Sequence, residues 1–202
     1  MSQPLSTRTL SFAVHSVSRI LGKKTSSWLV RMPFRLVSII GTATGIPYLR
    51  FVGLKEAAEA ALDRGNATKA DRLAAELLAL AERYRDDFNY GNAIHHGNKV
   101  RGLCALRAGR ISQAEDYLRA SGHSPGSPQL NSFGPSMRLA SALLEYNARQ
   151  AVLEYLEACK EFWQIAVRLP DGRLFTGRAQ LDQWAEAIRE NNVPDFRPNI
   201  GY

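Results

Sequence analysis

The stretch "RGLCALRAGRISQAEDYLRASGHSPGSP", residues 101–128, carries the pattern that decides the fold. Apolar residues recur in it at three- and four-residue intervals on both sides of a short turn at Gly109, as in an amphipathic helical hairpin. Glycine is common just after the end of a helix. The second helix runs into a segment rich in proline, glycine and serine, which interrupts the helical pattern. The stretch therefore predicts two antiparallel helices followed by a structured loop.

The same periodicity continues on both sides of this hairpin, from Leu54 to the C-terminus. Seven segments carry it: residues 54–66, 68–88, 91–109, 112–120, 136–146, 150–163 and 178–191. No segment between them shows a convincing strand pattern, so the sequence predicts an all-α fold. Three helices begin with a capping-box pattern, in which a side-chain oxygen and a residue three positions later satisfy free backbone N–H groups. The pairs are Thr68 with Asp71, Ser112 with Glu115 and, more loosely, Asn147 with Gln150.

Each predicted cap opens the second helix of a hairpin, and the caps are spaced close to the 34-residue tetratricopeptide period. Residues 54–165 resemble tetratricopeptide repeats. Gly102 and Ala114 match that family's small residues at the contact between two helices. The small residues that match in the other two hairpins are Ala58, Ala70 and Ala140. With the segments after "GSPQLNSFGPSM", the chain also resembles uncharacterised bacterial tetratricopeptide-like proteins.

This resemblance implies a short array of stacked antiparallel hairpins with a C-terminal helix, working as a protein-interaction module without catalysis. The chain departs from the family at Asn98 and Arg101, where larger apolar residues are usual. Glu59 stands where carboxylate-clamp domains of the family carry Asn, so we do not expect a ligand that is held by its C-terminal carboxylate.

Residues 1–53 differ in charge from the rest of the chain. They contain seven Lys or Arg residues and no Asp or Glu, whereas residues 54–202 are neutral, so the arm carries the whole net charge of +7. Such a basic arm is typical of a targeting or membrane-surface segment, and the alternative is an extra helix. The uncharged run at 36–49 is shorter than the about 20 residues that span a bilayer. The neutral remainder argues against a nucleic-acid partner.

The arm also bears on localisation. Ala43-Thr44-Gly45 has the small residues of a cleavage site, and Met32 offers an alternative start. The default expectation is a cytoplasmic protein, and the alternative is an exported or organelle-targeted one from which the arm is cleaved.

No pattern in the chain identifies a catalytic centre, a cofactor or a metal site. Cys104 and Cys159 lie among apolar residues of predicted helices, so we expect two buried thiols. His95 and His96 are adjacent and cannot share one ion from a helix. A small-ligand site or enzyme using His95, His96 and His123 is the alternative function.

The loop at residues 122–136 is too long and too rich in proline and glycine for a plain turn between helices. Leu130 and Phe133 are expected to anchor it, which makes it either a rigid spacer between hairpins or part of a binding surface. The expected ligand is a partner protein or peptide held in a groove between hairpins. The predicted partner-binding residues are Asn92, His95, His96, Asn98, Lys99, Gln129, Asn131 and Phe133.

Overall fold

The computed structural model describes residues 47–200. The chain divides into two units, residues 1–53 and 54–202, and of the first only Pro47–Gly53 is described. The predictions of a cleaved arm, a start at Met32 and a membrane-surface contact therefore lie outside the described residues. Within the described range, the structure contains no helix with the length and apolar character of a membrane span.

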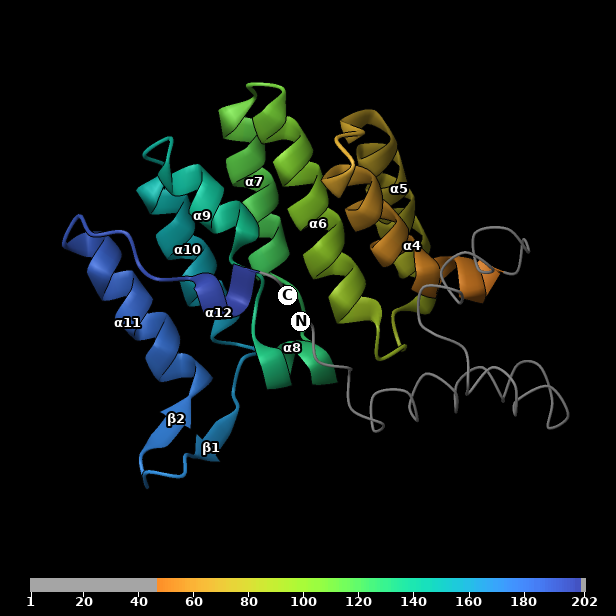
Figure 1. The fold of residues 1–202 in the computed structure, drawn as a ribbon. Helices are drawn as coiled ribbons and strands as arrows, with labels where there is room; N and C mark the ends of the chain where they lie inside the picture. The colour runs from red at the N-terminus through yellow and green to blue at the C-terminus, as the bar shows by residue number, and fades with distance from the viewer. Residues whose placement is uncertain (1–46, 201–202) are drawn as a thin grey trace, which may run out of the picture. The chain divides into compact units, whose positions relative to one another are not determined.

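The described residues form an all-α array with one small sheet, so the predicted fold class is confirmed (Figure 1). Its helices are α4 Pro47–Asp63, α5 Ala67–Ala81, the 3-10 turn η1 Glu82–Tyr84, α6 Tyr90–Arg107, α7 Ile111–Gly122, α8 Pro128–Phe133, α9 Arg138–Leu144, α10 Arg149–Cys159, α11 Gly177–Arg189 and α12 Arg197–Ile200. Its strands are β1 Ala166–Arg168 and β2 Leu174–Thr176.

Helix α6 lies between α5 and α7, and α10 packs on the other side of α7. Gly102 of α6 explains how closely these helices approach. A Cβ atom at that position would lie 2.3 Å from Leu139 Cδ2 of α9 and 3.2 Å from Tyr117 Cβ of α7. The absent side chain therefore leaves room for Leu139 and for the close approach of α7, and a larger residue at this position would require both neighbours to shift.

The three predicted helix caps are wrong. Gly65 and Gly109 adopt positive φ angles of 81° and 73°, which turn the chain so tightly that α5 and α7 begin one residue before Thr68 and Ser112. Asn66 is the actual cap of α5, and its side chain accepts a hydrogen bond from Lys69 N at 3.0 Å.

The other two predicted caps have no such replacement. The residue that precedes α7 is Arg110, which makes no side-chain cap hydrogen bond. Asn147 has a φ of 59° in the turn before α10, where Ala148 holds the capping position.

The expectation that the chain lacks strands is also wrong. Strands β1 and β2 form an antiparallel hairpin in which Val167 pairs with Phe175. Pro170, Asp171 and Gly172 make the turn, and Gly172 has a φ of 83°. Each strand has three residues, which is too short to show the alternation that identifies a strand in a sequence.

Helix α11 packs against α10 and the segment that follows it through polar and aromatic contacts. Arg149 donates to the carbonyls of Ile188 and Asn191 at 3.4 Å, at the end of α11. The Trp163 and Trp184 rings stack with centroids 5.9 Å apart. Cys104 and Cys159 are buried and unbridged, as expected.

Candidate functional site

His95 lies at the centre of the interior and has both ring nitrogens occupied. Nδ1 lies 3.1 Å from the carbonyl of Ser121, and Nε2 accepts from the N–H of Ser136 at 3.0 Å. The ring is therefore neutral with its proton on Nδ1. Burial lowers its pKa to about 3. His95 joins α6 to the end of α7 and to the loop before α9, and its ring nitrogens are not available to a substrate or metal.

His96 and Lys99 meet a carboxylate of α4. Oε1 of Glu59 accepts from Lys99 Nζ at 2.6 Å and lies 3.1 Å from His96 Nδ1. Burial alone would raise the pKa of Glu59, but the Lys99 ammonium and His96 hold it well below its usual range. Burial lowers the pKa of His96 and of Lys99. The cluster therefore ties α4 to α6 through a buried, hydrogen-bonded charge pair.

Glu56 lies one turn before Glu59 on α4. Its side chain is 28% exposed, yet Oε2 is covered and makes no hydrogen bond in the structure. Burial raises the pKa of Glu56 to about 7. The shift of the Glu56 pKa is therefore opposite in direction to that of Glu59 on the same helix.

Among the predicted partner-binding residues, Asn92 and Gln129 come together. Asn92 donates to Gln129 Oε1 at 3.0 Å and accepts from the Ser127 hydroxyl at 2.7 Å, while remaining only 7% exposed. This network fixes the start of α8 on α6. Ser127 also caps α8 through a 3.0 Å bond from Leu130 N.

The remaining predicted residues are separate from that network. Asn98 donates to Ile94 O of its own helix at 2.9 Å. Asn131 accepts from the backbone N–H of Gln164 at 3.0 Å. Phe133 of α8 is 48% exposed. Most of the predicted set thus holds the interior together, and Asn131 and Phe133 lie on the surface.

The loop at residues 122–136 acts as a spacer held on several sides. Tyr155 of α10 donates to Ser136 O at 2.8 Å, and Asn199 donates to Pro135 O at 3.1 Å. Gly134 has a φ of 83°, and a Cβ atom there would lie 2.5 Å from Trp163. These contacts fix the loop between α7 and α9, which supports the rigid-spacer interpretation.

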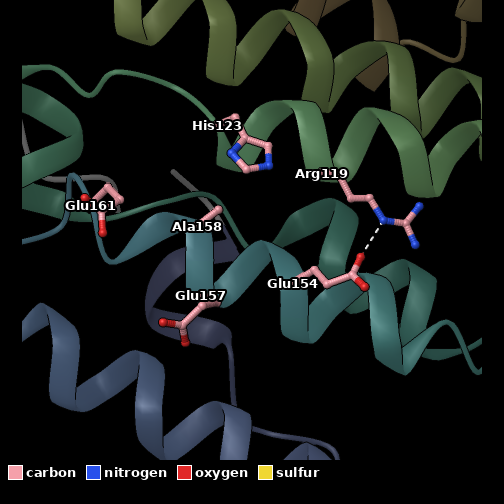
Figure 2. Close-up of a pocket in the computed structure, with 6 residues that line it drawn as sticks. All are labelled: Arg119, His123, Glu154, Glu157, Ala158 and Glu161. Atoms are coloured by element: carbon pink, nitrogen blue, oxygen red, sulfur yellow. Dashed lines mark hydrogen bonds and ion pairs between the residues drawn. The ribbon is translucent and has the colours of Figure 1, made fainter.

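A surface groove lies between the end of α7 and the exposed face of α10 (Figure 2). Its volume is about 480 Å³ and it is open to solvent. The residues that line it are Arg119, His123, Glu154, Glu157, Ala158 and Glu161. Gly122 sets the spacing at its closed end, because a Cβ atom there would lie 3.2 Å from Ala158 Cβ.

Carboxylates outnumber cations among the residues that line this groove and their ion-pair partners. Arg119 Nε bonds Glu154 Oε2 at 2.6 Å and its other nitrogens lie near Glu115 and Asp116, at 3.5 and 3.2 Å. Lys160 is shared in the same way between Glu157 and Asp182, at 2.6 and 2.7 Å. Arg119 and Lys160 thus form ion pairs with five carboxylates. Glu161 is a sixth carboxylate, and it pairs with no cation among residues 47–200. The acidic excess favours a positively charged ligand.

His123 lies on the groove wall (Figure 2). His95 and His96, by contrast, are buried in the interior. The three histidines therefore do not form one surface site. Residues 47–200 contain no group of three or more His, Cys, Asp or Glu side chains arranged to hold a metal ion.

No protein-family model, curated protein or solved structure matches this chain.

The groove residues were missed at the level of sequence, although a signal was present. Glu154 and Glu157 lie three residues apart on the solvent side of the amphipathic α10, and Glu161 follows four residues later, just beyond the end of the helix. Such spacing places side chains on one face of a helix. The sequence could not reveal that α7 ends beside that face and supplies the second wall.

Proposed function

We propose that this chain is a helical-repeat interaction module that binds a positively charged segment of a partner protein in the groove between α7 and α10. The observation that carries the proposal is the lining of the groove, where the three carboxylates Glu154, Glu157 and Glu161 outnumber the single guanidinium of Arg119. With their ion-pair partners included, six carboxylates stand against two cations. Exposed charges of one sign around a concave surface attract and orient a partner of the opposite sign.

The groove suits a side of a helix or an extended segment better than a small molecule. It is open to solvent, and long polar side chains surround the methyl group of Ala158. Small-molecule sites are usually more enclosed and bury most of the ligand. A basic helix with cations three or four residues apart would match the spacing of the acidic residues on α10.

The tetratricopeptide resemblance supports the same class of function. Gly102, Ala114 and Ala140, which match the family's small residues, are buried at or near helix contacts. Stacked helical hairpins present extended surfaces to partner proteins. That role is passive, so it needs no catalytic group.

A binding titration with full-length protein tests the proposal. The probe is a labelled helical peptide of about 15 residues with Lys or Arg at every third or fourth position, and the same peptide with Glu at those positions is the control ligand. The variant E154Q/E157Q/E161Q neutralises the groove. The matched control E145Q/E186Q/E190Q removes the same charge from exposed positions on α11 and at the ends of α9 and α11.

We expect the basic peptide to bind, and its affinity to fall with added salt because the charges are exposed. The groove variant should weaken binding roughly tenfold, as the loss of three exposed ion pairs implies. The control variant should change affinity much less. Equal weakening in both variants would mean that net charge, and not the groove, attracts the peptide. Absence of binding would contradict the proposal.

A further inference from the structure

The β1–β2 hairpin carries an open strand edge whose geometry follows from its register. Leu169 N donates to Arg173 O at 2.8 Å, and Gly177 N donates to Ile165 O at 3.0 Å. Hydrogen-bonded and non-hydrogen-bonded pairs alternate along an antiparallel ladder. Residues 165, 167 and 169 therefore turn their backbone groups toward β2, and Ala166 and Arg168 turn theirs away from it.

The row of backbone groups that face away from β2 is covered at one end and open at the other. Gln164 belongs to the same row, and its N–H is already held by Asn131 Oδ1 of α8 at 3.0 Å. The backbone N–H and C=O groups of Ala166 and Arg168 pair with no residue of the described chain outside the strand ladder. Both residues are exposed. The open edge thus consists of two donors and two acceptors.

Apolar side chains accompany this edge. Val167 is 44% exposed and Leu174 is 62% exposed. Val167 pairs across the hairpin with Phe175, whose ring centroid lies 6.1 Å from that of Trp163. Natural edge strands are protected by being very short, by charged side chains, by proline, by a bulge or by a covering segment. Strand β1 is short and contains Arg168, but between Ala166 and Arg168 it has no proline and no covering segment from the described chain.

We propose that β1 pairs with β1 of a second copy of this chain, antiparallel and centred on Val167. In this two-fold register Ala166 of each copy lies opposite Arg168 of the other. Both are hydrogen-bonded pairs, so four hydrogen bonds form and every outward backbone group of both open edges has a partner. The edge is complementary to itself, which is the reason for choosing a second copy over an unrelated extended peptide.

The two neighbouring registers fail for chemical reasons. Centring on Ala166 would require the Gln164 N–H, which already bonds Asn131. Centring on Arg168 would place two guanidinium groups opposite each other and would pair Ala166 with Pro170, which has no N–H to donate. In the Val167 register, by contrast, two valine side chains meet at the axis and Arg168 faces alanine.

The interface is small, because three residues from each copy form the pairing. Stable complexes bury about 1,200–2,000 Å², so this dimer is expected to be weak and to depend on protein concentration. It uses a different surface from the groove between α7 and α10, and it does not depend on the proposed function.

Sedimentation velocity of the full chain over a wide concentration range tests the inference. Arg168 and Leu174 form one cross-strand pair, and the N–H groups of both point away from the hairpin, toward opposite edges. Arg168→Pro therefore removes a donor from the β1 edge, and Leu174→Pro removes the equivalent donor from the β2 edge. Proline is tolerated in an edge strand where the N–H faces solvent. A further variant, Val167→Lys, places two like charges at the axis.

The parent chain and Leu174→Pro should show a sedimentation coefficient that rises with concentration. Arg168→Pro and Val167→Lys should remain at the monomer value, with unchanged circular dichroism and melting temperature. A parent chain that stays monomeric would overturn the inference. So would association that is equal in Arg168→Pro and the parent, because the β1 edge would then not be the contact.

Discussion

The inner side of α6 and the groove between α7 and α10 both contain charged side chains and histidines. His95, His96 and Lys99 of α6 are at most 3% exposed, and each is hydrogen-bonded to a group on another element. Glu154 and Glu157 of α10, and Glu161 just beyond its end, are exposed, and they outnumber the two cations that pair with them, Arg119 and Lys160. Burial makes an unpaired polar group costly, whereas solvent screens an unpaired charge at the surface. Polar residues therefore stabilise the fold in the first region and remain available to a partner in the second.

Substitution of His95 should cause the largest loss of stability. His95→Leu leaves the buried Ser121 carbonyl and Ser136 N–H without the partners they have now, and each loss costs about 1–3 kcal/mol. We expect the free energy of unfolding to fall by about 4 kcal/mol in urea denaturation. His123→Leu, at the exposed groove wall, should change it by less than about 0.5 kcal/mol. Similar losses in both variants would remove the distinction between the two regions.

The pH dependence sharpens the same point. An unfolded histidine is protonated below about pH 6.5, whereas buried His95 has a pKa of about 3 and the pKa of His96 is also lowered. The unfolded chain therefore binds more protons in this window, and stability falls as the pH decreases below about 6.5. Glu56 changes stability in the opposite direction. Its raised pKa of about 7 gives a contribution to the free energy of unfolding that is lost as the pH rises through that value.

Two histidines outweigh one carboxyl, so we expect net destabilisation on acidification from about pH 6.5 to pH 5. The slope should become shallower in His95→Leu than in the parent chain. Urea denaturation at a series of pH values measures both slopes. A parent chain whose stability is flat or rises on acidification would contradict the neutral, buried state of these rings.

A smaller loss of stability is expected when the charge pair between Glu59 and Lys99 is broken. Glu59→Gln leaves the Lys99 ammonium without its carboxylate, which costs about 3–5 kcal/mol at a fully buried pair. Because the Glu59 side chain is 26% exposed and Lys99 can lose its proton, we expect a loss of about 3 kcal/mol. Asp71→Asn breaks the exposed pair with Arg101 and should cost less than about 1 kcal/mol. Equal costs in chemical denaturation would argue against the buried character of the cluster.

The groove variant E154Q/E157Q/E161Q should have the smallest effect on stability. Its melting temperature should stay close to that of the parent chain, because the three carboxylates are exposed and make no buried contact. A large drop in melting temperature would mean that these residues stabilise the fold and were misread as a surface for a partner.

The helices could be predicted from the sequence because their apolar faces repeat over many turns, as in α5 and α11. The helix starts could not, because the positive φ angles of Gly65 and Gly109 set them and a pattern of hydroxyl and acid does not. The β hairpin was missed because three-residue strands show no period, although Pro170, Asp171 and Gly172 mark its turn.

The candidate site was predicted less well than the fold. Asn, His and Lys side chains on α6 resemble an exposed polar surface in the sequence, and the partners that bury them come from distant segments. Ser136, for example, is 41 residues from His95. The acidic face of α10 could have been read from its spacing, but its second wall depends on the packing of α7 against α10.

The measurement that tests the central claim most directly is an NMR titration of the isotope-labelled full chain with the basic helical peptide. We expect the amide signals of Arg119, His123 and Glu157, around the groove, to shift, while those of His95 and His96 on α6 keep their positions. Shift changes centred on Asn92 and Gln129, with the groove unaffected, would contradict it and would return the binding surface to the polar residues of α6 and α8.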